Sequence, residues 1–122
     1  MRYALLCYNS EAMVSHLPKA DEEAMMARVR AAETKISERA RIGPSLRLMP
    51  TTAATTVKAG DDPLVIDGPY AETKEQLLGF WIIECESHED AIEAGRLLAR
   101  EREVGGIEVR PLLAYNAGDE TP

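Results

Sequence analysis

The stretch that decides the fold is DGPYAETKEQLLGFWIIE, at residues 67–84. Its first part is a turn, Asp67-Gly68-Pro69, followed by a charged segment, because Asp-Gly suits a tight turn and proline cannot donate to a strand ladder. Its last part begins the strongest predicted strand of the chain, residues 79–86. Successive side chains in a strand point to opposite faces, and here both faces are apolar. We therefore expect both faces of this strand to be covered.

Residues 2–8 predict another strand that is apolar on both faces. The spacing of apolar residues predicts a helix over 21–41, which Gly43-Pro44 stops. A second helix is predicted over 88–102, with Ser87 as its N-cap.

Between these elements, residues 53–67 predict a hairpin around a turn at 60–63. Residues 71–76 predict one helical turn, and residues 107–113 predict the last strand. The order strand-helix-strand, repeated twice, is typical of a ferredoxin-like α+β sandwich, βαββαβ, with an inserted hairpin.

Helices in this topology cover one face of the sheet, yet the central strands are apolar on both. A second copy of the chain would cover the other face, so we expect a homodimer that forms a dimeric α+β barrel. The chain reads as a single domain over 1–116 with a flexible C-terminal tail at 117–122.

The composition limits the possible partners. The 21 acidic and 14 basic residues give a net charge of -7, which argues against binding to nucleic acid or to an anionic membrane. The apolar runs are of strand length, and the N-terminus does not resemble a signal peptide, so we expect a cytoplasmic protein. Cys7 and Cys85 are expected to be buried hydrophobes in a reducing compartment. Two histidines and no cysteine pair make a zinc site improbable, and no sequence pattern calls for a cofactor.

The motif at 67–84 resembles the signature of the YCII-related proteins, in the subgroup named for a DGPF motif. Its usual form is DGPF-AETKEQLGGF, and this chain has Tyr70 where Phe is usual and Leu78 where Gly is usual. The opening MRYALLCY and the segment ATTVK at 54–58 are also similar to the family. The resemblance covers about 2–113 and implies a ferredoxin-like fold and a dimeric barrel.

The resemblance implies less about activity. One YCII-type relative is a dehydrochlorinase acting on a chlorinated hydroxyquinol, and a His-Asp pair is the proposed active site of the YCII branch. The matching position for that histidine is near Met25 or Met26, and no histidine occurs in 21–41. DGPF proteins are also often encoded beside extracytoplasmic-function sigma factors, which implies a regulatory setting.

Asp67 is the candidate catalytic residue, because a carboxylate at a strand end beside a glycine could act as a general base. Alternatively, its side chain caps its own turn. Tyr70, Glu72 and Lys74 are candidate ligand-binding residues: a hydroxyl for the ligand, an acid or base, and a cation for an anionic substrate. Alternatively, Glu72 and Lys74 belong to an exposed turn with weak local ion pairs.

His16 is a further candidate, since it lies in the loop after the first strand, where it could gate a cavity. Trp81 is expected to pack in the core or in a sheet-to-sheet interface. Two hypotheses follow. The protein binds or transforms a small organic molecule in a cavity lined by Tyr70 and Trp81, with lyase-like or proton-transfer chemistry at Asp67. Alternatively, it is a non-catalytic module of a sigma-factor system.

Overall fold

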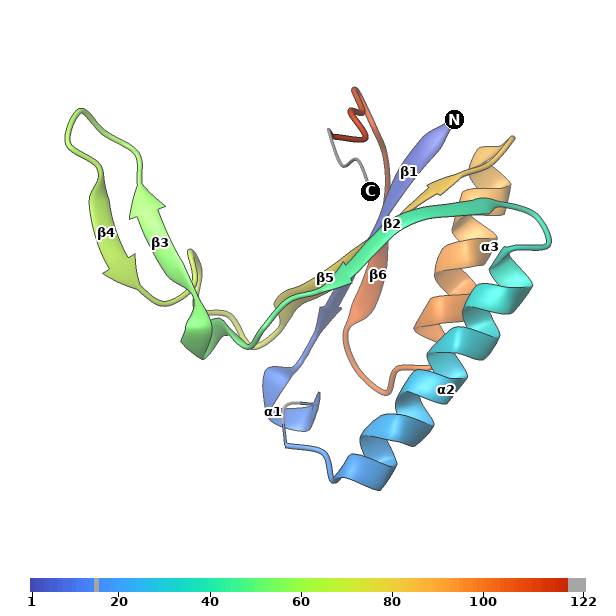
Figure 1. The fold of residues 1–122 in the computed structure, drawn as a ribbon, viewed down its shortest axis with the longest axis horizontal. Helices are drawn as coiled ribbons and strands as arrows, with labels where there is room; N and C mark the ends of the chain where they lie inside the picture. The colour runs from blue at the N-terminus through green and yellow to red at the C-terminus, as the bar shows by residue number, and fades with distance from the viewer. Residues whose placement is uncertain (15, 119–122) are drawn as a thin grey trace.

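A four-stranded antiparallel sheet forms the centre of the molecule, and its strands lie in the order β2-β5-β1-β6 (Figure 1). The computed structural model describes residues 1–14 and 16–118. The two strands that are apolar on both faces, β1 and β5, are the central pair, as expected. With one long helix after β1 and one after β5, this order confirms the ferredoxin-like α+β fold. The strands are β1 (Arg2–Asn9), β2 (Arg41–Arg47), β5 (Gln76–Glu84) and β6 (Gly106–Pro111).

Both long helices, α2 (Lys19–Ile36) and α3 (His88–Ala99), lie on the same side of the sheet (Figure 1). The short helix α1 (Glu11–Val14) connects β1 to α2. The predicted cap of α3 is confirmed, because the Ser87 hydroxyl oxygen accepts a hydrogen bond from the Asp90 backbone N–H at 3.1 Å. Such a cap satisfies one of the N–H groups that the first turn of a helix leaves unpaired.

The hydrophobic core fills the space between the helices and the sheet. Alternate residues of the central strands enter it and are at most 9% exposed: Tyr3, Leu5, Cys7, Trp81 and Ile83. Trp81 pairs with Leu5 on the helix-covered side, so of its two predicted locations the core is confirmed and the sheet-to-sheet interface is wrong. Cys7 and Cys85 are free and buried, as predicted.

The first long helix ends earlier than predicted. It stops at Ile36 and not at Arg41, and Arg41 is instead the first residue of the strand β2. The reason is that Ile42 pairs with Ile83 and packs against the core, which only an extended backbone allows here. Gly43-Pro44 does not stop a helix; it lies where the β2–β5 register shifts, between Ile42 and Ser45. Proline is tolerated at such an irregularity of an edge strand.

The predicted helical turn at 71–76 is also wrong, because these residues form bends and Gln76 already belongs to β5. The Gln76 side-chain amide donates to the Ala71 carbonyl at 2.8 Å and so holds the bends together. The helix predicted over 88–102 ends at Ala99, and the last strand runs from Gly106 to Pro111.

The predicted hairpin is confirmed as a separate two-stranded sheet, β3 (Thr55–Lys58) paired with β4 (Leu64–Asp67). We call residues 55–67 the arm. The arm stands well clear of the main sheet and its helices (Figure 1). A short 3₁₀ helix, η1 (Thr51–Ala53), leads into it. At its base the Gly68 N–H donates to the Ala54 carbonyl at 2.8 Å, with Gly68 at a φ of 112°.

The second face of the main sheet carries the other alternate residues of each strand, and both long helices lie on the opposite side. We call this the open face. Within residues 1–14 and 16–118, no helix packs on it. Its centre is apolar and consists of Ala4, Leu6, Tyr8, Leu46, Phe80 and Ile82.

No helix in the described part of the chain is long and apolar enough to cross a membrane. Residues 119–122 of the tail predicted at 117–122 lie outside the described residues.

Candidate functional site

Four of the five residues predicted to carry chemistry lie on the surface around the arm. Asp67 ends β4, and Tyr70, Glu72 and Lys74 follow it in the bends that lead back to β5, all of them exposed. Tyr70 is 85% exposed. His16 lies in the connection between α1 and α2, which belongs to another part of the chain. None of these residues lines the pocket beside Met1 and Glu84 or the hollow beside Lys19 and Met26.

The predicted cavity between sheet and helices therefore does not bring Asp67, Tyr70 and Trp81 together. Trp81 is in the core, whereas Asp67 and Tyr70 are at the base of the arm. The turn after Asp67 is held by the backbone bond between Gly68 and Ala54. The roles predicted for these residues stay predictions.

The open face carries the apolar side chains that the sequence predicted for the second face of the central strands; the charged residues at one end of it were not predicted. Its centre is apolar: Leu6 pairs with Phe80, which also pairs with Leu46, and Ala4 pairs with Ile82. Leu46 is 41% exposed. An apolar floor of this kind binds the apolar part of an organic molecule through the hydrophobic effect.

The open face is charged at one end and along its β6 edge, where Arg110 pairs with Ala4 and Glu108 pairs with Leu6. Arg2 and Arg41 contact the two carboxylate oxygens of Glu84, each at 3.3 Å. The Arg110 side chain donates from Nε to Glu108 at 2.6 Å. We call these five residues the charged end. In sequence they are up to 108 positions apart, so only the strand register brings them together: Arg2 and Arg41 both pair with Glu84.

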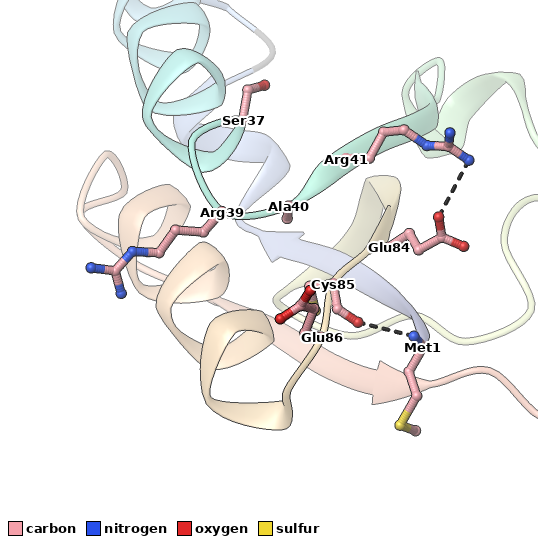
Figure 2. A pocket seen from close by; sticks show the side chains of 8 residues that line it. All are labelled: Met1, Ser37, Arg39, Ala40, Arg41, Glu84, Cys85 and Glu86. Atoms are coloured by element: carbon pink, nitrogen blue, oxygen red, sulfur yellow. Dashed lines mark hydrogen bonds and ion pairs between the residues drawn. The ribbon is translucent and has the colours of Figure 1, made fainter.

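A pocket of about 590 Å³ adjoins the charged end (Figure 2). The connection from α2 to β2, the end of β5 and the N-terminus form its wall. The Met1 amino group donates to the Cys85 carbonyl at 2.9 Å, which continues the β1–β5 pairing by one residue. Arg41 points toward Glu84, while Arg39 points away from it (Figure 2). The lining residues are Met1, Ser37, Arg39, Ala40, Arg41, Glu84, Cys85 and Glu86.

The comparison with known proteins agrees with this architecture. The model of the YCII-related domain family matches residues 1–116. The chain belongs to the YCII-related domain family. A protein of Rhizobium meliloti (strain 1021), described as uncharacterized, is 44% identical to it over 121 residues, which are 98% of each chain.

In this YCII-related chain, the positions that match the family's histidine take part in packing. Met25 and Met26 are half-buried on α2. The Arg47 guanidinium lies 3.4 Å from the Met26 sulfur and 3.4 Å from the Glu22 carboxylate. A thioether cannot take up or release a proton, so Met26 cannot replace an acid–base histidine.

Metal ligation has no support in the described part of this YCII-related chain. Residues 1–14 and 16–118 hold no group of three or more His, Cys, Asp or Glu side chains that could bind a metal ion.

Cys85 is held as a neutral thiol. Burial raises its pKa above the ordinary value of 9.0, and the nearby Asp90 carboxylate raises it further. The N-terminal ammonium and a hydrogen bond with the Ser87 backbone act in the opposite direction and are the weaker effects. Because the thiolate is the nucleophile, Cys85 is a poor candidate for covalent chemistry.

This pKa predicts a pH dependence of stability. A thiol whose pKa is raised by folding contributes stability that is complete below pH 9.0. That contribution is lost as the pH rises above this value, because the unfolded chain then releases the proton first. We expect the stability difference between the native protein and Cys85→Ala to shrink between pH 8 and pH 10, measured by urea unfolding in reducing buffer. A difference that stays constant over this range would contradict the assignment.

Proposed function

We propose that the protein is a homodimer that binds a small organic molecule over the open face, in the space that two facing sheets enclose. One observation carries the proposal: the centre of the sheet is apolar on a face that no helix of the described chain covers. Soluble monomers rarely expose a continuous apolar surface of this kind, and such a surface marks a site for a partner or a ligand.

The dimer and the ligand site are parts of the same proposal. Two sheets packed through their open faces bury Leu6 and Phe80 and enclose a concave space between them. A site of this type is mostly apolar and has a few polar groups that orient the ligand. The open face has both parts, since its apolar centre ends at the arginines and carboxylates of the charged end.

The proposed reaction class is proton transfer or a lyase-type elimination, with the Asp67 carboxylate as acid–base group. Asp67 belongs to the arm and not to the main sheet, so the arm has to close over the bound molecule for this role. Exchanging Asp67→Asn would then abolish turnover and leave binding intact.

A second candidate function is favoured by the arm. Its apolar residues are exposed, with Val57, Leu64 and Val65 each more than 60% exposed. A two-stranded hairpin is only marginally stable alone, so such an arm gains stability from a protein surface. This would suit a non-catalytic interaction module, such as one in a sigma-factor system.

The dimer is tested by the mass of the protein in solution. We expect light scattering coupled to size exclusion at micromolar concentration to give twice the mass of one chain. Phe80→Asp puts a charge at the centre of the open face and should give a monomer, because burying an unpaired carboxylate is unfavourable. Ile92→Asp is the matched control: Ile92 is 38% exposed on α3, in the helix layer, and should remain dimeric.

A native protein that is monomeric at this concentration would overturn the proposal. Ligand binding is tested separately by thermal shift with a set of small organic compounds, both neutral and charged. We expect Phe80→Asp to lose the shift that Ile92→Asp keeps. Binding that survives in the Phe80→Asp monomer would place the site elsewhere.

A further inference from the structure

The charged end collects positive charge in an acidic protein. Three guanidinium groups, those of Arg2, Arg41 and Arg110, face two carboxylates, those of Glu84 and Glu108. One positive charge within this group is therefore not compensated, although the whole chain carries a net charge of -7. Ion pairing alone would match each arginine with one carboxylate, so the third arginine is not explained by ion pairing.

The contacts leave donors available. Arg2 and Arg41 share the single carboxylate of Glu84, one guanidinium on each oxygen, at 3.3 Å. Each guanidinium has five N–H donors, and these contacts use few of them. The Arg41 side chain is 78% exposed, so its remaining donors are accessible to a ligand.

Arg2 is fixed in place from two sides. Its guanidinium carbon lies 4.7 Å from the centre of the Tyr115 ring, a cation–π contact, and Glu84 holds its other side. Glu84 is thus a positioning residue that aligns Arg2 and Arg41 beside each other. A guanidinium held in one orientation loses less entropy when it binds a carboxylate through two parallel hydrogen bonds.

The apolar floor begins next to these arginines. Ala4 is two residues from Arg2 on the same face, and it pairs with Ile82 in β5 and with Arg110 in β6. Two residues along a strand span about 7 Å, which is close to the length of a benzene ring with one substituent. The Ala4 side chain is only 8% exposed, so the half-buried Ile82 provides most of the apolar contact beside the arginines.

We infer that the open face binds an organic monoanion, with its carboxylate on Arg2 and Arg41 and its apolar body on Ile82. The single surplus positive charge suits a ligand with one negative charge. This inference rests on the proposed function, because it names the class of molecule that the open face takes.

The test compares two probes of the same shape, benzoate and its neutral amide benzamide, by NMR titration of the native protein at low salt. We expect benzoate to perturb the amides of Ala4, Ile82 and Glu84 and to bind about ten-fold more tightly than benzamide. Arg41→Gln should weaken benzoate binding about ten-fold and leave benzamide binding unchanged.

Arg96→Gln is the matched control, since Arg96 is an exposed, ion-paired arginine in the helix layer. It should bind benzoate like the native protein. Arg110→Gln is a second test variant for the case that circular dichroism shows Arg41→Gln to be misfolded. We expect Arg110→Gln to weaken benzoate binding as well.

Equal affinity for benzoate and benzamide, unaffected by Arg41→Gln, would overturn the anionic class while the proposed function stands. The inference also fails if neither probe shifts the NMR signals of amides on the open face. In that case the proposed function is decided separately, by the mass of the protein in solution and by the thermal-shift measurements with small organic compounds. A shift of Arg41→Gln to a monomer would overturn the inference too, because the arginines would then pair with carboxylates of the second copy.

Discussion

Replacing Trp81 with alanine is expected to lower the free energy of unfolding by about 3–5 kcal/mol, the usual loss for removing a large buried aromatic side chain. Trp81 is 9% exposed and packs between the sheet and the helices. Its indole N–H donates to the Glu33 carboxylate of α2 at 2.8 Å. The Arg102 guanidinium lies 5.9 Å from its ring centre. The substitution therefore removes packing, a charge-assisted hydrogen bond and a cation–π contact together.

Urea unfolding at a fixed protein concentration measures this loss, with circular dichroism as the signal because Trp81 is the single tryptophan of the chain. Trp81→Phe is the matched control, since it keeps a ring in the core but leaves Glu33 without its donor. We expect it to lose about 1–3 kcal/mol. If Trp81→Ala lost less free energy of unfolding than Trp81→Phe, the Trp81 side chain would not occupy the core.

Replacing Gly79 with alanine is expected to lower the free energy of unfolding by about 3 kcal/mol, at the upper end of the range for overpacked sites. A Cβ atom at Gly79 would overlap the Leu46 carbonyl oxygen and lie 3.2 Å from the Arg47 Cα. Both atoms belong to the backbone of β2, which cannot turn aside as a side chain can. The strand β2 would therefore have to move away from β5. The hydrogen bond that the Leu48 N–H donates to the Leu78 carbonyl at 2.8 Å opposes this movement.

Gly106 provides the control for this substitution. It also lies in a strand, β6, but a Cβ atom there would meet nothing within 4 Å. We expect Gly106→Ala to change the free energy of unfolding by no more than about 0.5 kcal/mol. Similar losses in the two alanine variants would indicate a general cost of replacing glycine, and not the close approach of β2 to β5.

Several features of the fold could be predicted from residues that are neighbours in the sequence. Continuous apolar runs were enough to predict β1 and β5 as central strands, because a strand with two apolar faces belongs in the middle of a sheet. The turn residues at 60–63 and Asp67-Gly68 predicted the hairpin, because the backbone preferences of turn residues are also local. The family also follows from the sequence, since the motif extends over many consecutive positions.

Helix boundaries were less predictable. The apolar periodicity ends at Ile36, as α2 does, but the basic residues before Gly43-Pro44 extended the predicted helix to Arg41. Residues 41–47 form a strand instead, because Ile42 pairs with Ile83 and packs against the core. Here packing with a distant strand outweighs local propensity. The same competition places Gly43-Pro44 inside β2, although both residues locally favour the end of a helix.

The sequence by itself therefore determined the fold class, the central strands, the hairpin and the family, because each depends on neighbouring residues. Only the tertiary structure decided which face Trp81 occupies, where Asp67 and Tyr70 lie, and which arginines share Glu84. These depend on the register between strands that are distant in the chain, and a shift of one residue would move every side chain of a strand to the other face. The charged end exists because the register pairs both Arg2 and Arg41 with Glu84.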